Sequence, residues 1–230
     1  MADDTEERTA QKGVFDAGRS IVRPQRGGLG YVTAPASQIP VFASTDVLVI
    51  GGGPAGTTAA IAAARTGASV ILVERYNHLG GLSTGGLVIW IDRMSDWDGR
   101  LVIRGLAEEL LDRLPSDAIK GPDASIWGSR DQAAVSEWAP RASAHHGAVT
   151  WAPMIDPEWL KLASLAMISE AGVDVLLHSW ASGPLMEDGR LAGAIIESKE
   201  GRVAIRARAV VDASGDGDMF ARAGEGAEGD

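Results

Sequence analysis

The feature that most constrains this sequence is a strand, a glycine-rich turn and a helix that follow one another without a gap. The run over 46–50 (DVLVI) is rich in β-branched residues, which is typical of a strand buried on both faces of a parallel sheet. The turn over 51–56 (GGGPAG) comes next, and the alanine-rich run over 57–65 favours a helix that ends before Gly67. A second apolar run over 69–73 completes a βαβ unit, so the pattern predicts an α/β fold with a parallel sheet.

The turn carries the pattern G-x-G-x-x-G, and each of its glycines has its own mechanical role. Gly51 permits the tight turn, Gly53 lets a pyrophosphate approach the backbone, and Gly56 lets the helix pack against the strand. The start of the helix presents free N–H groups and a partial positive charge to phosphates. Glu74 ends the second strand, where a carboxylate can accept both hydroxyls of a ribose. A glycine-rich turn alone could lack a ligand, but in this context it predicts a dinucleotide site.

More glycines follow the second strand, in the loop over 79–86 (LGGLSTGG). A Gly-Gly loop with Ser and Thr offers N–H groups to a phosphate and can pass close to a flat ring. A simple nicotinamide-binding domain would normally enter its next helix near this point. The loop therefore argues against a complete small NAD-binding reductase and for a different dinucleotide.

The second half of the chain predicts a helix and then more strands. Asp156 and Pro157 are good N-cap and N1 residues for a helix that runs to about Glu170. The apolar run over 173–178 predicts a strand that joins the parallel sheet.

Three strand-like runs follow, and they are separated by two hairpin turns. The turns are predicted at 187–189 (EDG) and 199–201 (KEG), and the third run, over 202–208, alternates apolar residues with arginines. After this antiparallel meander, a separate buried strand is predicted over 209–213. It leads into the turn over 214–218 (SGDGD).

On residues 46–56, 67–74 and 79–84, the sequence resembles the flavin-dependent oxidoreductases of the glutathione-reductase-like superfamily, and in particular the broad group of FAD-dependent oxidoreductases. The helix–strand–meander–strand order and the turn that begins at Ser214 are similar to this family too, although the family more often has Thr at that position. The resemblance covers roughly residues 40–224 and is diffuse between 90 and 150. It implies a Rossmann-like FAD-binding domain with a parallel sheet and a three-stranded antiparallel meander.

The resemblance also implies which residues contact FAD. These residues are Gly51, Gly53, Pro54, Ala55, Gly56, Glu74, Arg75, Gly80, Gly81, Leu82, Ser83, Thr84, Ala181, Ser214, Gly215, Asp216 and Asp218. Some relatives attach FAD covalently through a histidine in the region of His78. The residues around His78 do not match that pattern well, so we expect non-covalent binding.

Catalytic residues are less defined than cofactor contacts. A flavin takes a hydride at N5, so the protein supplies placement, exclusion of water and sometimes a base. His145 and His146 are weak candidates for that base, and a solvated pair of loop histidines is the alternative. No further ligand has recognisable spacing from them, so no metal site is predicted.

The domain organisation follows from the same resemblance. We expect an N-terminal arm and extended segment over 1–45, an FAD-binding domain over 46–224, and an acidic Gly-rich tail over 225–230. The stretch over 90–150 is predicted to be an inserted segment that reaches toward the substrate side.

The family normally continues for a similar length again, with most of the substrate-facing part there. We therefore expect a hetero-oligomer in which a second polypeptide supplies the substrate domain and the remaining flavin contacts. The alternatives are a truncated fragment of a longer flavoenzyme and a non-catalytic dinucleotide-binding or structural subunit.

Composition supports these expectations by exclusion. The 230 residues contain 29 glycines, well above the average usage of roughly 7%, and the motifs above account for much of this excess. The absence of Cys excludes disulfides, Cys-ligated zinc and thiol catalysis within this sequence. A net charge of −10 argues against nucleic-acid partners. No secretory signal pattern or membrane-spanning run is present, so we expect a cytoplasmic protein with a small-molecule substrate.

Overall fold

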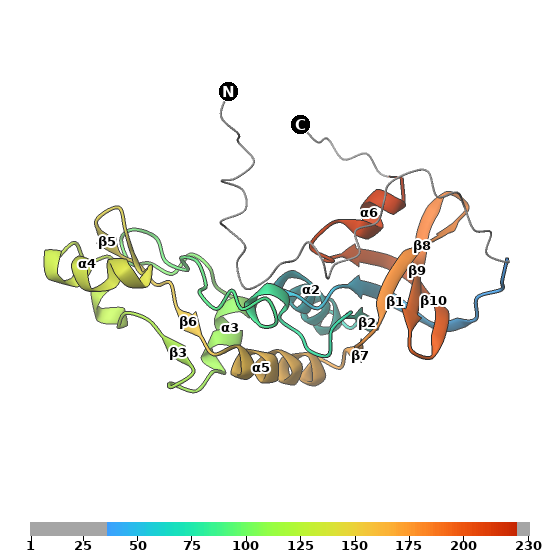
Figure 1. Ribbon diagram of the computed structural model, residues 1–230, viewed down its shortest axis with the longest axis horizontal. Helices are drawn as coiled ribbons and strands as arrows, with labels where there is room; N and C mark the ends of the chain where they lie inside the picture. Colours follow the sequence, from blue (N-terminus) through green and yellow to red (C-terminus); the bar gives the residue numbers. More distant parts are fainter. Residues whose placement is uncertain (1–35, 225–230) are drawn as a thin grey trace, which may run out of the picture. The chain divides into compact units, whose positions relative to one another are not determined.

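A six-stranded sheet forms the framework of the protein in a computed structural model (Figure 1). Its strand order is β7-β2-β1-β10-β9-β8. The strands are β1 (Val41–Ile50), β2 (Val70–Val73), β7 (Asp174–Leu176), β8 (Trp180–Glu187), β9 (Arg190–Ser198) and β10 (Gly201–Asp212). Strands β7, β2, β1 and β10 run parallel, whereas β9 pairs antiparallel with both β10 and β8. The predicted α/β fold, with a parallel sheet and a three-stranded meander, is confirmed.

The structure describes residues 36–224. The predicted arm, much of the extended segment over 13–45 and the predicted tail over 225–230 lie outside these residues. The predicted division into domains stays a prediction.

The helices are 5 to 14 residues long, and two of them, α2 (Pro54–Arg65) and α5 (Pro157–Glu170), contribute buried side chains to the core cluster around β1 and β2. The others are α3 (Leu106–Asp112), α4 (Gln132–Trp138) and α6 (Asp218–Arg222), with 3-10 turns η2 (Gly81–Ser83), η3 (Ala124–Ile126) and η4 (Ala139–Arg141). Helix α5 begins as predicted, because the side chain of Asp156 accepts hydrogen bonds from the N–H groups of Glu158 and Trp159. It ends at Glu170, and Gly172 follows with a positive φ of 75°.

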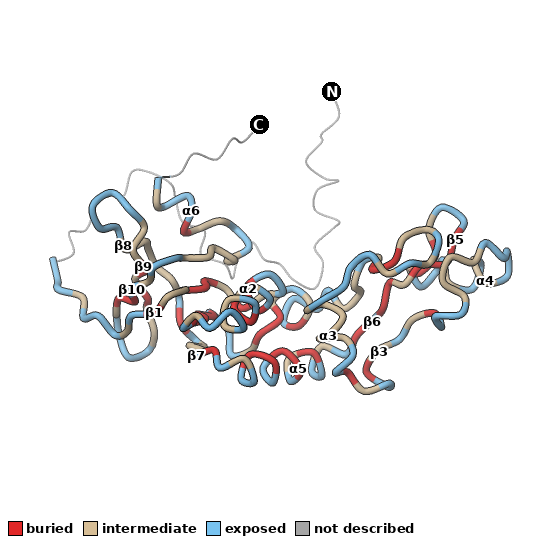
Figure 2. The backbone as a smooth tube through the Cα atoms, turned by 180° about the vertical axis from the view of Figure 1, so that it is seen from behind, coloured by how far each residue is buried: buried red, intermediate tan, exposed pale blue. Residues whose placement is uncertain are grey.

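The central strands are buried on both faces, as their apolar runs predict. Val49 and Leu72 pack with Ile61 of α2 and Ile168 of α5 in one core cluster. Their neighbours in the chain, including Leu48, pack in a second cluster with residues of β9, β10 and α6. Figure 2 shows that α5 has one buried side and one exposed side along its length.

Strand β10 corrects one detail of the sequence interpretation. The prediction separated a meander strand over 202–208 from a buried strand over 209–213, but residues Gly201–Asp212 form one continuous strand. Its first half pairs with β9, and the stretch from Ala204 onward pairs with β1. No turn residue interrupts the chain near Arg208, so the change from alternating to apolar residues marks a change of neighbours and not a strand boundary.

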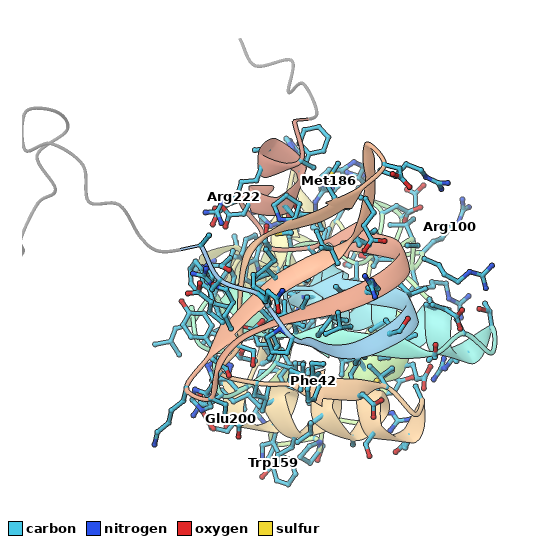
Figure 3. The ribbon with its side chains drawn as sticks, turned by 90° about the vertical axis from the view of Figure 1, so that its right-hand side faces the viewer. Phe42, Arg100, Trp159, Met186, Glu200 and Arg222 are labelled. Carbon is cyan, nitrogen blue, oxygen red and sulfur yellow. The ribbon has the colours of Figure 1, made fainter. Side chains whose placement is uncertain are left out.

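Strand β1 also differs from the prediction at its start. It begins at Val41, whereas the apolar run predicted a strand from Asp46. The extension exists because the long strand β10 continues beside it, with Val41 opposite Ala204. Phe42, labelled in Figure 3, is 60% exposed and lies at a register shift between Val41 and Ala43, so the pairing of its two neighbours with β10, and not burial, holds this extension in the strand.

The two predicted hairpin turns are present in the meander. Asp188 and Gly189 have positive φ values of 51° and 74°, as expected for a two-residue type I′ turn between β8 and β9. The turn between β9 and β10 contains Glu200, labelled in Figure 3. Arg222 of α6 donates a hydrogen bond to the carbonyl of Ser182 at 2.7 Å, which ties the last helix to β8.

Residues 88–156, which include the predicted inserted segment, contain α3, α4 and small strand pairs. Strands β3 (Ile119–Lys120) and β6 (Met154–Ile155) pair antiparallel, as do β4 (Ala144–His145) and β5 (Ala148–Val149). Trp90 forms an isolated antiparallel bridge with Met154.

Gly193 of β9 offers a test of the meander. A Cβ at this position would overlap the carbonyl oxygen of Ile205 on the neighbouring strand, and φ is +150°. We expect Gly193→Ala to lower the free energy of unfolding by about 1–3 kcal/mol, because the two strands must separate locally. Chemical denaturation measures the change.

Gly183→Ala is the matched control in the adjacent strand β8. A Cβ at Gly183 meets no atom within 4 Å, so we expect its effect to stay within about 0.5 kcal/mol. Equal effects at the two glycines would contradict the tight approach of β9 to β10.

Candidate functional site

A cavity of about 680 Å³ lies where β1, β2 and β10 end. Because these strands are parallel, their carboxyl ends meet at one edge of the sheet, which is the usual ligand position in such sheets. The lining residues are Ile50, Gly51, Gly53, Pro54, Ala55, Glu74, Arg75, Tyr76, His78, Gly81, Leu82, Ser83, Gly85, Gly86, Val88, Ser179, Trp180, Ala181, Ala213, Ser214, Gly215, Asp216, Asp218 and Met219. All but three of the predicted FAD contacts are among them, the exceptions being Gly56, Gly80 and Thr84.

The start of helix α2 faces this cavity with free hydrogen-bond donors. Gly53 is the N-cap residue and has no side chain to cap the helix, and Pro54 has no N–H group. The N–H groups of Ala55 and Gly56 therefore lack intrahelical acceptors. A Cβ added at Gly53 would meet only the Cα of Gly81, at 4.0 Å, so this position is open. The backbone here can accept a close phosphate.

Gly56 has a packing role instead. A Cβ at this position would overlap the carbonyl oxygen of Gly51, which lies at the end of β1. Gly51 itself has a φ of 98°, a conformation that favours glycine. The first and third glycines of the motif thus set the approach of the helix to the strand, and the second leaves room for a ligand.

Glu74 joins the glycine-rich turn to the loop after β2. Its carboxylate is buried and accepts a hydrogen bond from the N–H of Gly52 at 2.6 Å and another from Tyr76 at 2.8 Å. A carboxylate has about four lone-pair positions, so each oxygen keeps one for a hydroxyl group. Glu74 lines the cavity, and this arrangement fits the predicted contact with a ribose.

Gly80 and Thr84 shape the loop behind the cavity wall. The hydroxyl of Thr84 is buried and donates to the carbonyl of Leu79 at 2.7 Å. Gly80 has a φ of 99°, and a Cβ there would overlap the Thr84 side chain. The sequence identified both residues, and the structure gives them a supporting position within the loop.

Asp212 organises the turn after β10, and the sequence interpretation missed it. Its carboxylate accepts hydrogen bonds from the N–H and hydroxyl groups of Ser214 and from the N–H groups of Met219 and Phe220. Burial raises the pKa of Asp212, but these hydrogen bonds outweigh burial and hold the pKa below its ordinary value. The turn with Gly215 and Asp216 is thereby fixed against the cavity. The signal was an acidic residue at the end of an apolar strand, directly before the turn.

An aromatic cluster at the cavity was also missed. The guanidinium of Arg75 lies 4.9 Å from the ring centre of Tyr76 and 5.4 Å from that of Trp180. Hydrogen bonds from Ser179 to the carbonyl of Glu74 and from His178 to that of Tyr76 bring the two segments together. The local signal was an aromatic residue beside each predicted contact, Tyr76 after Arg75 and Trp180 before Ala181.

The weak catalytic candidates do not line this cavity. His145 lies in β4, where its Nε2 is 2.9 Å from the carbonyl oxygen of Ala142. His146 packs edge-on against Trp97, with ring centres 4.9 Å apart. His78, by contrast, does line the cavity, and its Nδ1 lies 3.2 Å from the carbonyl oxygen of Leu79. Within residues 36–224, no cluster of three His, Cys, Asp or Glu side chains is arranged to hold a metal ion.

Comparison with known proteins identifies the family. Residues 46–228 match the family described as FAD dependent oxidoreductase. The chain belongs to this family. FAD is therefore the cofactor, as the sequence predicts, and nothing in the matches indicates a covalent link. The narrower glutathione-reductase-like assignment stays a prediction.

Individual relatives agree with the family. A digeranylgeranylglycerophospholipid reductase of Thermoplasma volcanium is 32% identical over 177 residues, covering 77% of this chain and 41% of the relative. A thiamine thiazole synthase of Aeropyrum pernix is 30% identical over 185 residues, covering 74% of this chain and 54% of the relative. The crystal structure of a geranylgeranyl bacteriochlorophyll reductase-like protein from Thermoplasma acidophilum is similar, with a TM-score of 0.51, 25% identity and coverage of 79% of this chain and 42% of that chain. The chain thus spans about half or less of the length of these relatives.

The helices carry no sign of a membrane span. In the part of the chain that the structure describes, none is both long enough and apolar enough to cross a bilayer.

The carboxylate of Asp212 predicts a pH-dependent effect on stability. Asp212→Asn replaces one of the two acceptor oxygens with an NH2 group, which cannot accept the hydrogen bonds either from Ser214 or from Met219 and Phe220. We expect the free energy of unfolding at pH 7 to fall by about 1.5–3 kcal/mol. Denaturant titration at several pH values measures this effect.

The sign of the pH dependence follows from the lowered pKa. The wild-type carboxylate stabilises the fold above the unfolded-state pKa of about 4, and this contribution is lost as pH falls through the lower folded-state pKa. The difference between wild type and variant therefore shrinks in acid. Asp117→Asn, at an exposed position, is the control. A difference that stays constant from pH 7 into strong acid would refute the role of the charged form.

Proposed function

We propose that this chain is the FAD-binding part of a flavin-dependent oxidoreductase that transfers a hydride between an organic substrate and the flavin. One observation carries the proposal: the open side of Gly53 and the free donors of α2 face the same cavity as the carboxylate of Glu74. A ligand that contacts all of them needs phosphates and a ribose. When bound, FAD supplies the hydride chemistry at its N5 atom.

The lining residues divide by chemistry into four groups. Glu74 would hold the ribose hydroxyls, and the start of α2 would hold the pyrophosphate. Arg75 and Trp180 present flat surfaces suited to a purine ring. The loop with Ser83 and the turn with Asp216 also line the cavity and would contact the rest of the cofactor.

The relatives differ in the substrates that their names give. The names of the relatives cover a lipid reductase and a thiazole synthase, so their shared part supports the cofactor and not one substrate. His145 and His146 do not line the cavity, so the role of either residue as a base stays a prediction.

We further propose that a second polypeptide completes the substrate side of the cavity. One observation supports this proposal. Leu82 and Val88 line the cavity and are still 69% and 48% exposed, so an apolar part of its wall lies open. The alternatives are the same domain within a longer chain, and a subunit that binds the dinucleotide without chemistry.

Purification from the native source tests the second-polypeptide proposal. We expect this chain to travel with one other polypeptide in fixed ratio, identified by mass spectrometry, and flavin absorbance to travel with the pair. A native chain much longer than 230 residues, or a chain that purifies alone with its flavin, would contradict it.

The glycine motif gives a sharper test of the cofactor site. Gly53→Ala places a methyl group in open space, so we expect the free energy of unfolding to change by no more than about 0.5 kcal/mol. The same methyl group occupies the position that a phosphate would approach. We expect FAD affinity to fall by about tenfold or more, measured by equilibrium titration.

Two comparisons make this test specific. Gly56→Ala is the matched variant, and we expect it to destabilise the fold by about 1–3 kcal/mol because its methyl group overlaps the Gly51 carbonyl. ADP serves as the second ligand: a flavin site binds FAD more tightly than ADP. Equal affinities for the two ligands would favour the non-catalytic alternative, and an unchanged FAD affinity in Gly53→Ala would place the pyrophosphate elsewhere.

A further inference from the structure

A second cavity, of about 380 Å³, lies within residues 88–156. It is lined by Lys120, Gly121, Trp138, Arg141, Ser143 and Met154. It shares no lining residue with the cavity of about 680 Å³ at the ends of β1, β2 and β10, which we call the nucleotide cavity. Two of its six residues are cationic and none is acidic, although the chain as a whole has a net charge of −10. A pocket whose charged lining residues are both cationic favours an anionic ligand.

The two cations are available to such a ligand. Lys120 donates to the carbonyl of Ser116 at 3.3 Å and has no carboxylate partner in the described part of the chain. Arg141 contacts Glu137 at 3.1 Å through one nitrogen, and both side chains are more than half exposed. An exposed pair of this kind contributes little free energy, so the guanidinium can engage a better acceptor.

The other walls comprise the apolar side chains of Trp138 and Met154 and the buried side chain of Ser143. The Arg141 guanidinium lies 4.9 Å from the ring centre of Trp138, which positions the aromatic wall beside the charge. Met154 is 42% exposed and pairs with Lys120 through the β3–β6 strands. The hydroxyl of Ser143 donates to the carbonyl of Ala152 at 2.8 Å and is buried, so this part of the wall is fixed. A ligand with an anionic group and an apolar part matches both halves of the pocket.

A short piece of chain links a lining residue of the nucleotide cavity to a lining residue of the second cavity. Val88 lines the nucleotide cavity, and Trp90, two residues later, bridges to Met154 of the second cavity. Two residues span at most about 7 Å, and bridged residues have Cα atoms about 5 Å apart. The Cα atoms of Val88 and Met154 therefore lie within about 12 Å of each other. A single elongated molecule can reach from one cavity toward the other.

We propose that the second cavity binds the phosphate group of an amphiphilic organic substrate, whose apolar part extends toward the nucleotide cavity. A phosphate suits the site because it accepts from a guanidinium fork and from an ammonium group at once. The term substrate rests on the proposed oxidoreductase function, whereas the anion site itself does not.

Calorimetric titration of the full 230-residue chain tests the ligand class. The probe is n-octyl phosphate, and n-octanol and inorganic phosphate are the matched arms that lack the charge or the chain. We expect n-octyl phosphate to bind about tenfold or more tightly than either. Equal binding of n-octanol would overturn the anion site, and equal binding of inorganic phosphate would overturn the amphiphilic ligand in favour of free phosphate.

Variants locate the binding site. We expect the double variant Lys120→Gln/Arg141→Gln to lose about tenfold or more of the affinity for n-octyl phosphate. Lys120→Arg, which keeps the charge, should retain it. The control Arg190→Gln/Lys199→Gln removes the same charge from exposed positions of the meander and should have no effect. Retained affinity in Lys120→Gln/Arg141→Gln, or an equal loss in the control, would overturn the proposal.

FAD titration of the same variants separates this inference from the proposed function. We expect Lys120→Gln/Arg141→Gln to keep its FAD affinity, which also shows that it is folded. A chain that binds n-octyl phosphate through Lys120 and Arg141 but does not bind FAD would overturn the proposed function and leave the anion site intact. The reverse result would overturn the anion site alone.

Discussion

The close approach of helix α2 to the end of β1 is the constraint on which the candidate cofactor site depends. This site lies at the edge of the sheet where β1, β2 and β10 end. Gly56 allows this approach, because any side chain there would overlap the carbonyl oxygen of Gly51. The turn after β10 meets the same point, since a Cβ at Gly51 would overlap the Ala213 carbonyl. Three backbone segments therefore converge without side chains between them. This convergence leaves the helix start facing a cavity and not a packed core.

The carboxylates of two residues hold the turns at this edge of the sheet in place through hydrogen bonds. Glu74 binds the N–H groups of Gly52 and Tyr76, and Asp212 binds those of Ser214, Met219 and Phe220. Glu74 joins the turns that follow β1 and β2, and Asp212 fixes the turn that follows β10 to the start of α6. The donors at the start of α2, by contrast, have no acceptor within the helix. The N–H groups at the start of α2 are therefore available to an anionic ligand.

Local patterns in the sequence predicted the elements that depend on adjacent residues. The βαβ unit, the Asp156 cap and the Asp188-Gly189 turn each depend on a few adjacent residues, so they can be read without the fold. The continuity of β10 and the early start of β1 depend on which strands become neighbours, and no local pattern records that. The contact of Arg75 with Trp180 joins residues far apart in the chain, so it also required the structure.

The single strand β10 has a mechanical consequence. Its first residue follows the β9–β10 turn that contains Glu200, and its last residue, Asp212, anchors the turn at the cofactor cavity. The strand is hydrogen-bonded along its length and has no break at which it could bend freely. We therefore expect a displacement at the outer hairpin to be transmitted along β10 to the cavity. The meander is in this way mechanically coupled to the cavity wall through a single strand.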